Sequence, residues 1–151
     1  MSDIKNIFDI SGRAMSAQLT RLNTVASNLA NANNVSGSID KAYKAIKPVF
    51  ETKFADSLRQ SGLASVDAVQ IKEVNRLPEK IYMPEHPQAN EEGFIFNAAV
   101  NVEEELVEML EASRQYQNNI EVVSTLRNLM MRTINMGKWL KPGENNVNYR
   151  P

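Results

Sequence analysis

The sequence has no cysteine, and its 151 residues include a single histidine, His86. The absence of cysteine excludes disulfides and thiolate metal sites. With one histidine, a metal site would need carboxylates alone, so we interpret His86, which lies between Pro84 and Pro87, as a loop residue. We therefore expect no metal and no other cofactor.

Long apolar runs and basic runs are also missing. No window approaches 18 consecutive apolar residues, so no membrane-spanning helix is predicted. The formal net charge is −1 and no basic run has interleaved aromatics, so we expect no nucleic-acid partner. Near the start, Asp3 and Asp9 stand where a signal peptide would be basic and then apolar, so none is expected. Taken alone, these features indicate one soluble domain, cytosolic by default.

Catalytic motifs are absent too. No serine lies in a nucleophile-elbow context, and no glycine-rich phosphate loop follows a strand. The run Glu103-Glu104-Glu105 has two interpretations, paired catalytic carboxylates or acidic side chains at the start of an expected helix. We favour the second, because negative charges interact favourably with the helix dipole there. We expect no enzyme activity and no small-molecule substrate.

The longest helical pattern runs from Val102 to about Leu140. Asn101 is placed to cap it, Glu104 to reach back to the cap, and Pro142 with Gly143 to end it. Its apolar stripe, in steps of three and four, comprises Val102, Leu106, Met109, Ser113, Tyr116, Ile120, Val123, Arg127, Met130 and Ile134. A second row runs beside it through Val122, Leu126, Leu129, Met136 and Leu140. The combined stripe is wider than one partner helix can cover.

A second helix is expected from Ser2 to about Asn31. Its stripe comprises Phe8, Gly12, Met15, Leu19, Leu22, Ala26 and Leu29, widened by Ile4 and Val25. Gly12 costs about 1 kcal/mol relative to alanine, and the many Ser, Thr and Asn residues are mediocre helix formers. This helix is intrinsically weak and needs burial against partners. The Asn, Ser and Gly cluster from Asn31 to Ser38 predicts a helix stop and a loop.

The middle of the chain changes period. The segments 49–54 and 66–74 are rich in β-branched and aromatic residues, and 57–62 supplies turn residues between them, so we expect a β-hairpin or small sheet. Leu77-Pro78 and the stretch from Met83 to Pro87 are interpreted as extended linkers. A turn at Glu92-Gly93 then leads through Phe94-Ile95-Phe96 to the long helix.

These elements predict a mainly α fold with a small β insert. We divide the chain into an N-terminal helix (1–34), a β-containing insert with its linker (35–100), a C-terminal helix (101–140) and a tail (141–151). The two helices have matching stripes and are expected to pair as an antiparallel coiled coil, with the insert projecting from one end. The surplus apolar surface of the second helix would be a liability in a monomer and a contact in a polymer.

Two segments at opposite ends then resemble one family. The motif Ala26-Ser27-Asn28-Leu29-Ala30-Asn31-Ala32 closely resembles the N-terminal signature of bacterial flagellar rod, hook and hook-associated proteins, and the segment 105–119 looks like their C-terminal signature. The short length and the stretch 82–94, which reads YMPEHPQANEEGF, resemble the proximal-rod members. The resemblance covers about residues 8–34 and 80–137.

The resemblance implies a rod subunit that packs into a helical tube and carries torque from motor to hook. Its implied partners are other copies of itself, other rod proteins, the flagellar type III export apparatus and the membrane ring of the basal body. Its implied location is the periplasmic rod, reached without a cleaved signal peptide. The side chains expected to pack between subunits are Met15, Leu19, Leu22, Asn28, Leu29, Asn31, Leu106, Met109, Tyr116, Ile120, Val123, Leu126 and Met130.

Some alternatives remain open at this stage. Asn28 and Asn31 either cap the helix end or are solvated, or they form interhelical hydrogen bonds within the tube. Arg127 either lays its stem on apolar surface or pairs across subunits with a carboxylate such as Glu121. Trp139 is an exposed anchor or a cap on the helical pair. The alternative function is a non-polymeric helical adaptor or export chaperone, which would be stably folded at low concentration and mainly helical without a β insert.

Overall fold

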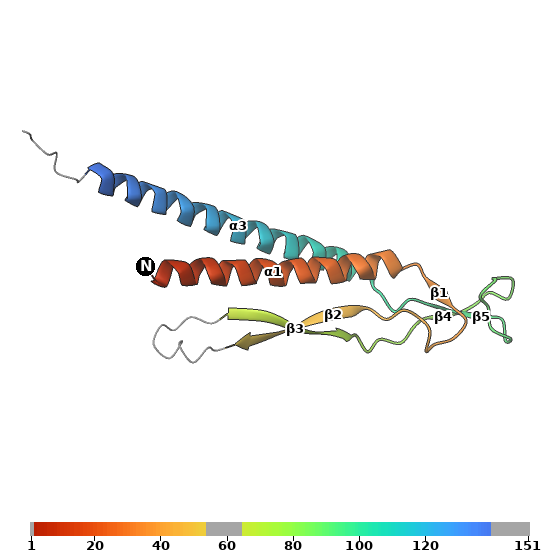
Figure 1. Cartoon of the computed structure of the whole chain (residues 1–151). Helices are drawn as coiled ribbons and strands as arrows, with labels where there is room; N and C mark the ends of the chain where they lie inside the picture. Colours follow the sequence, from red (N-terminus) through yellow and green to blue (C-terminus); the bar gives the residue numbers. More distant parts are fainter. Residues whose placement is uncertain (1, 54–64, 140–151) are drawn as a thin grey trace, which may run out of the picture.

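The computed structural model describes residues 2–53 and 65–139 (Figure 1). Its elements are helix α1 (Ser2–Asn31), strands β1 (Val35–Ser36), β2 (Ile46–Lys53), β3 (Ser65–Glu73), β4 (Lys80–Tyr82) and β5 (Phe94–Asn97), and helix α3 (Val102–Trp139). Both long helices are confirmed at nearly the expected bounds. The expected turn at 57–62, the Pro142-Gly143 stop and the tail lie outside the described residues.

Helix α1 is the middle layer of the molecule. It runs antiparallel to α3 on one side and lies against the hairpin of β2 and β3 on the other (Figure 1). We expected the insert to project from one end, and for the hairpin this was wrong. The hairpin folds back along α1, where Arg21 lies 6.0 Å from the centre of the Phe50 ring. A helix this weak gains stability from contacts on two sides.

The expected hairpin is confirmed within the described residues. Strands β2 and β3 pair antiparallel, from Ile46 opposite Glu73 to Lys53 opposite Ser65. A register shift between Val49 and Phe50 marks a bulge, which increases the local twist. The β-branched and aromatic residues that predicted these strands therefore lie where the pattern placed them.

A second, three-stranded sheet in the order β1-β5-β4 was not expected. Strand β1 lies in a stretch interpreted as a loop, and it is two residues long, too short to leave a periodic signal. Strand β4 lies just after Leu77-Pro78. Both pair antiparallel with β5, the strand that the Phe94-Ile95-Phe96 run forms.

The interpretation of the segment from Met83 to Pro87 as an extended linker was wrong. His86 donates its backbone N–H to the Met83 carbonyl at 3.0 Å, and Ala89 donates to the His86 carbonyl at 2.9 Å. These are two successive turns with Pro84 and Pro87 at their second positions. Proline suits that position because its fixed φ matches the turn, even though the residue before it avoids the helical region.

The core is made mostly of small side chains. The buried apolar residues are Ala17, Val25, Ala42, Ala45, Ile95, Ala98, Ala99 and Ala112. Large apolar side chains remain exposed along α3, including Val107, Leu110, Val122, Leu129, Met131, Ile134 and Met136. A single chain therefore leaves much of its apolar surface in contact with water.

Gly12 offers a direct test of how weak α1 is. The residue is exposed, and a Cβ built there meets nothing within 4 Å. We expect Gly12→Ala to raise the free energy of unfolding by about 0.5–1 kcal/mol, because alanine loses less backbone entropy in a helix. Urea unfolding followed by circular dichroism measures the change, and unchanged or lower stability would contradict it.

Candidate functional site: the paired helices and their exposed faces

The face of α3 that packs within the chain is centred on small and polar residues. Ala112 is fully buried and Glu105 is 3% exposed. Around them lie half-buried side chains at helical spacing: Met109, Tyr116, Val123, Leu126 and Met130. These five belong to the residues that we expected to pack between subunits, and that expectation stays a prediction. Tyr116, which we expected in this contact, is half-buried.

Five of the ten residues of the expected stripe are exposed in the chain: Val102, Leu106, Ile120, Arg127 and Ile134. Leu106 is 48% exposed and Ile120 is 46% exposed. The stripe also left out Glu105 and Ala112, the two residues at the centre of the contact within the chain. The pattern favoured large apolar residues, whereas close approach of two helices favours a small one. Leu106 and Ile120 remain candidates for contacts between subunits.

Ala112 makes the close approach of the helices testable. We expect Ala112→Leu to lower the free energy of unfolding by about 1–3 kcal/mol, because the added methylenes overpack a fully buried position. The matched control is Gln115→Leu, an exposed position one turn further along α3, where we expect less than about 0.5 kcal/mol. Urea unfolding of the two variants compares them, and equal effects would show that Ala112 does not set the distance between the helices.

The residues of α1 that we expected to pack between subunits also include both half-buried and exposed side chains. Met15, Leu22 and Leu29 are half-buried, whereas Leu19 is 45% exposed. The exposed Leu19 is available to another molecule. Asn28, by contrast, has no exposed surface at all.

Asn28 joins α1 to the start of strand β2. Its Nδ2 donates to the Ile46 carbonyl at 2.9 Å, and its Oδ1 accepts the Ile46 N–H at 2.9 Å and the Tyr43 hydroxyl at 3.1 Å. The side-chain amide thus pairs with Ile46 as a neighbouring strand would. Within the described chain Asn28 therefore neither caps α1 nor bonds to a second helix; a hydrogen bond to a helix of another subunit stays a prediction. The sequence did not predict this role because Ile46 lies 18 residues from Asn28 and no local pattern connects the two.

Asn31 makes local bonds at the end of α1. Its Nδ2 donates to the Ser27 carbonyl at 2.8 Å, and its Oδ1 accepts the Asn34 side-chain amide at 2.8 Å. These bonds end the helix, as the cap alternative for this residue predicted. The two asparagines of the motif therefore have different partners.

The start of α3 follows the expected capping pattern. Asn101 Oδ1 accepts the backbone N–H groups of Glu103 at 3.0 Å and Glu104 at 3.2 Å. Glu104 reaches back to the Asn101 side-chain amide at 3.1 Å and also binds Arg76 with both carboxylate oxygens at 3.0 Å. A second ion pair, between Lys47 and Glu108, joins β2 to α3. Both pairs lie within the first two turns of α3.

Glu105 is the residue that the sequence described least well. The run of three glutamates was interpreted as one dipole-facing group, but only Glu105 turns into the chain's interior. Its Oε2 has no hydrogen-bond partner in the described part of the chain. Such a group is costly in a folded protein. The spacing of seven residues from Glu105 to Ala112 and from Ala112 to Asn119 could have predicted that the three share one helix face.

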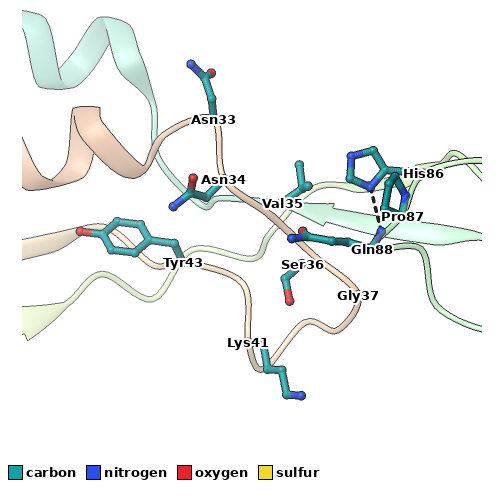
Figure 2. A pocket seen from close by; sticks show the side chains of 10 residues that line it. All are labelled: Asn33, Asn34, Val35, Ser36, Gly37, Lys41, Tyr43, His86, Pro87 and Gln88. Carbon is teal, nitrogen blue, oxygen red and sulfur yellow. Dashed lines mark hydrogen bonds between the residues drawn. The ribbon is translucent and has the colours of Figure 1, made fainter.

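A polar hollow of about 760 Å³ lies between the end of α1 and the turns at His86 (Figure 2). Its lining includes Lys41, Tyr43 and His86, whose side chains point in different directions in Figure 2. Chemistry at a site requires converging groups. This hollow does not bring them together.

His86 has a single local bond in this hollow, where its Nδ1 accepts the Gln88 N–H at 3.1 Å (Figure 2). The bond is exposed, so water can replace it. We expect His86→Ala to change the free energy of unfolding by less than about 0.5 kcal/mol and to leave assembly intact. A contrasting variant is Gly37→Ala, whose Cβ would lie 2.8 Å from the Gln88 carbonyl oxygen and should destabilise the same region. Thermal unfolding compares them, and a loss of assembly in His86→Ala would contradict the loop interpretation.

Neither a metal site nor a membrane-spanning helix is formed by the described residues. Residues 2–53 and 65–139 contain no group of three or more His, Cys, Asp or Glu side chains placed to hold a metal. Among the same residues, no helix combines the length and hydropathy that crossing a bilayer requires.

Comparisons with known proteins agree with this geometry. Residues 8–37 match the family model described as flagella basal body rod protein, and residues 91–136 match the one described as flagellar basal body rod FlgEFG protein C-terminal. The two matches fall on α1 and on the β5–α3 region. The segments that pair within the fold are therefore the segments that the family models describe.

Curated relatives extend the match over most of the chain. The flagellar basal-body rod protein FlgC of Salmonella typhimurium is 39% identical over 134 residues, covering 88% of this chain and 97% of its own. FlgC of Escherichia coli O6:H1 is 38% identical over 133 residues with the same coverage, and FlgC of Aquifex aeolicus is 36% identical over 138 residues, covering 91% of this chain and 100% of its own. The chain belongs to the FlgC family of flagellar basal-body rod proteins. It is a structural rod subunit of the flagellum and not an enzyme.

Proposed function

We propose that this FlgC-family chain is a subunit of the proximal rod that assembles through its terminal helices into a helical tube and transmits torque from motor to hook. The observation that carries the proposal is the exposed apolar surface of α3, where Leu110 is 73% exposed, Val107 63% and Met136 62%. Water contact over so much apolar surface is unfavourable, and neighbouring subunits would cover it.

The partners follow from the same surface. We propose that α1 and α3 pair as a coiled coil in the tube, and that further copies and other rod proteins pack on their exposed faces. Met15, Leu19, Leu22, Leu29, Leu106, Met109, Tyr116, Ile120, Val123, Leu126 and Met130 are the side chains proposed for this packing. The membrane ring of the basal body is a further proposed neighbour, and the proposed location is periplasmic.

Export suits the weakness of α1. A narrow type III channel favours chains with little stable structure in transit, and the Gly12, Ser and Asn content of α1 keeps the helix weak on its own. The helices would then become fully ordered only on assembly, as segments that order on binding do. We propose that the chain passes the flagellar export apparatus without a cleaved signal peptide.

The alternative is a non-polymeric adaptor or export chaperone. Such a protein would be stable as a monomer, would cover its own apolar faces and would be helical without a β insert. The exposed rows on α3 and the hairpin packed on α1 favour the rod subunit instead.

Hydrogen exchange on the full chain tests the proposal. At low concentration, with the monomer verified by gel filtration, we expect the helices at 2–34 and 102–140 to exchange faster than the middle of the chain, because they are only marginally stable in the monomer, and to exchange much more slowly after assembly. Strong protection of both helices in the monomer would favour the adaptor. A parallel test expresses the chain in a strain lacking its own FlgC, where restored swimming is expected and its absence would contradict the rod function.

A further inference from the structure

Helix α3 is divided into blocks of opposite charge. Residues 102–111 contain five glutamates and no lysine or arginine. Residues 122–139 contain Arg127, Arg132 and Lys138 and no acidic residue. Between them, 112–121 carries one charge of each sign, Arg114 and Glu121. We call the first segment the acidic block and the second the basic block.

Several charges in both blocks face water and have no ion-pair partner among the described residues. Glu103, Glu111, Arg127 and Arg132 are exposed, and within residues 2–53 and 65–139 none of them forms an ion pair. By contrast, Glu104 and Glu108 are already bound to Arg76 and Lys47. The charges left over are therefore available to another molecule.

The dipole of α3 accounts for only part of this arrangement. Its effect falls off within the first and last turns, so it covers Glu103 but neither Glu111 nor Arg127. Intramolecular pairing does not account for them either, because α3 is one straight element and its two blocks lie far apart (Figure 1). From Glu111 to Arg132 the separation is about 21 residues, roughly 32 Å at 1.5 Å per residue.

Each block also exposes large apolar side chains. The acidic block exposes Leu106, Val107 and Leu110, and the basic block exposes Leu129, Met131, Ile134 and Met136. Interfaces between proteins combine an apolar centre with charged groups that set register and orientation. Both blocks have this composition, with opposite signs.

We propose that the acidic block of one copy docks on the basic block of a second copy, with the two α3 helices parallel and offset by about 30–35 Å, a length estimated from the helix rise. This inference rests on the proposed assembly function and specifies the register of that contact. A parallel offset leaves one acidic and one basic block free at the two ends, so the contact repeats along an open polymer. An antiparallel pair would satisfy both blocks at once and stop at a dimer.

Charge exchange tests the proposal with purified full-length chains and sedimentation velocity. We expect Arg127→Glu/Arg132→Glu and Glu103→Lys/Glu111→Lys each to lower self-association at least tenfold, because each leaves like charges facing one another. A 1:1 mixture of the two variants should recover association, since acidic blocks then meet basic ones. The four-substitution chain should associate with itself and fail to join the original chain.

The controls separate charge register from folding and from function. Arg114→Glu/Glu121→Arg exchanges charges outside the two blocks and should leave association unchanged, and circular dichroism should show equal helix content in all variants. Association of the original chain should weaken from 0.05 to 0.5 M salt, because the charges are screened. Variants that associate normally, a closed dimer, or cross-links joining the helices antiparallel would overturn the proposal. If the original chain restores swimming and the charge variants do so equally, this inference fails while the rod function stands; if the original chain itself does not restore swimming, the rod function fails.

Discussion

Ile120→Asp is expected to abolish incorporation into the rod while leaving the isolated chain folded. Ile120 is 46% exposed on α3, so a carboxylate there is solvated in the monomer. In an assembled contact the same carboxylate would lose its water, and an unpaired charge in an apolar contact is strongly unfavourable. We expect at least a 100-fold loss of association, equivalent to about 2.7 kcal/mol. The measurement is the amount of chain in purified basal bodies, with swimming as a second readout.

The matched control is Gln117→Asp, which adds the same charge one turn away at an exposed polar position of the same helix. It should incorporate normally. Leu29→Asp should also abolish assembly, but Leu29 is half-buried beside Asn28, so its effect includes a loss of monomer stability. Normal incorporation of both Ile120→Asp and Leu29→Asp would contradict packing through these faces.

Asn28→Ala is expected to cause the largest loss of monomer stability among the polar residues discussed. Truncation leaves the Ile46 N–H and carbonyl without their partner, and each buried unpaired group costs about 1–3 kcal/mol. We therefore expect a loss of about 2–5 kcal/mol in the free energy of unfolding. Exchange of the Ile46 amide hydrogen should accelerate more than that of the amides elsewhere in β2, because the change removes its acceptor directly.

The control for Asn28→Ala is Asn23→Ala, an exposed asparagine on the same helix. Alanine is the better helix former, so stability there should stay equal or rise slightly. Asn28→Asp tests the donor separately: Oδ1 can still accept from Ile46 and Tyr43, but the Ile46 carbonyl loses its bond. Equal stability of the variants at positions 28 and 23 would show that Asn28 does not hold β2 on α1.

The sequence predicted the elements whose signal is periodic and local. Both helices and the β2–β3 hairpin were expected because their patterns run for many residues, and the Asn101 cap was expected because its partners lie within three residues. The family was also anticipated, since its two motifs lie on these helices. Nothing in the chain's pattern gave strand β1, whose two residues are specified by pairing with β5.

What the sequence missed depends on distant partners or on size. Asn28 bonds to Ile46 across a loop, and no local pattern connects the two residues. The predicted inward face of α3 included Leu106 and left out Ala112, because hydrophobicity ranks leucine above alanine. Closely packed helices need the smaller side chain at their contact. The turns at Pro84 and Pro87 were missed because proline restricts the residue before it and also favours the turn that follows.

The two ion pairs between the insert and α3, from Arg76 to Glu104 and from Lys47 to Glu108, both lie within the first two turns of that helix. Among the described helices and strands, α1 is the one that packs along α3. Helix α3 is thus held at its start, next to Asn101, by ion pairs to the insert, and along its length by packing against α1. A small rotation about the start of α3 would move its far end the most, so a single chain could meet neighbours at unequal angles without rearranging its β elements.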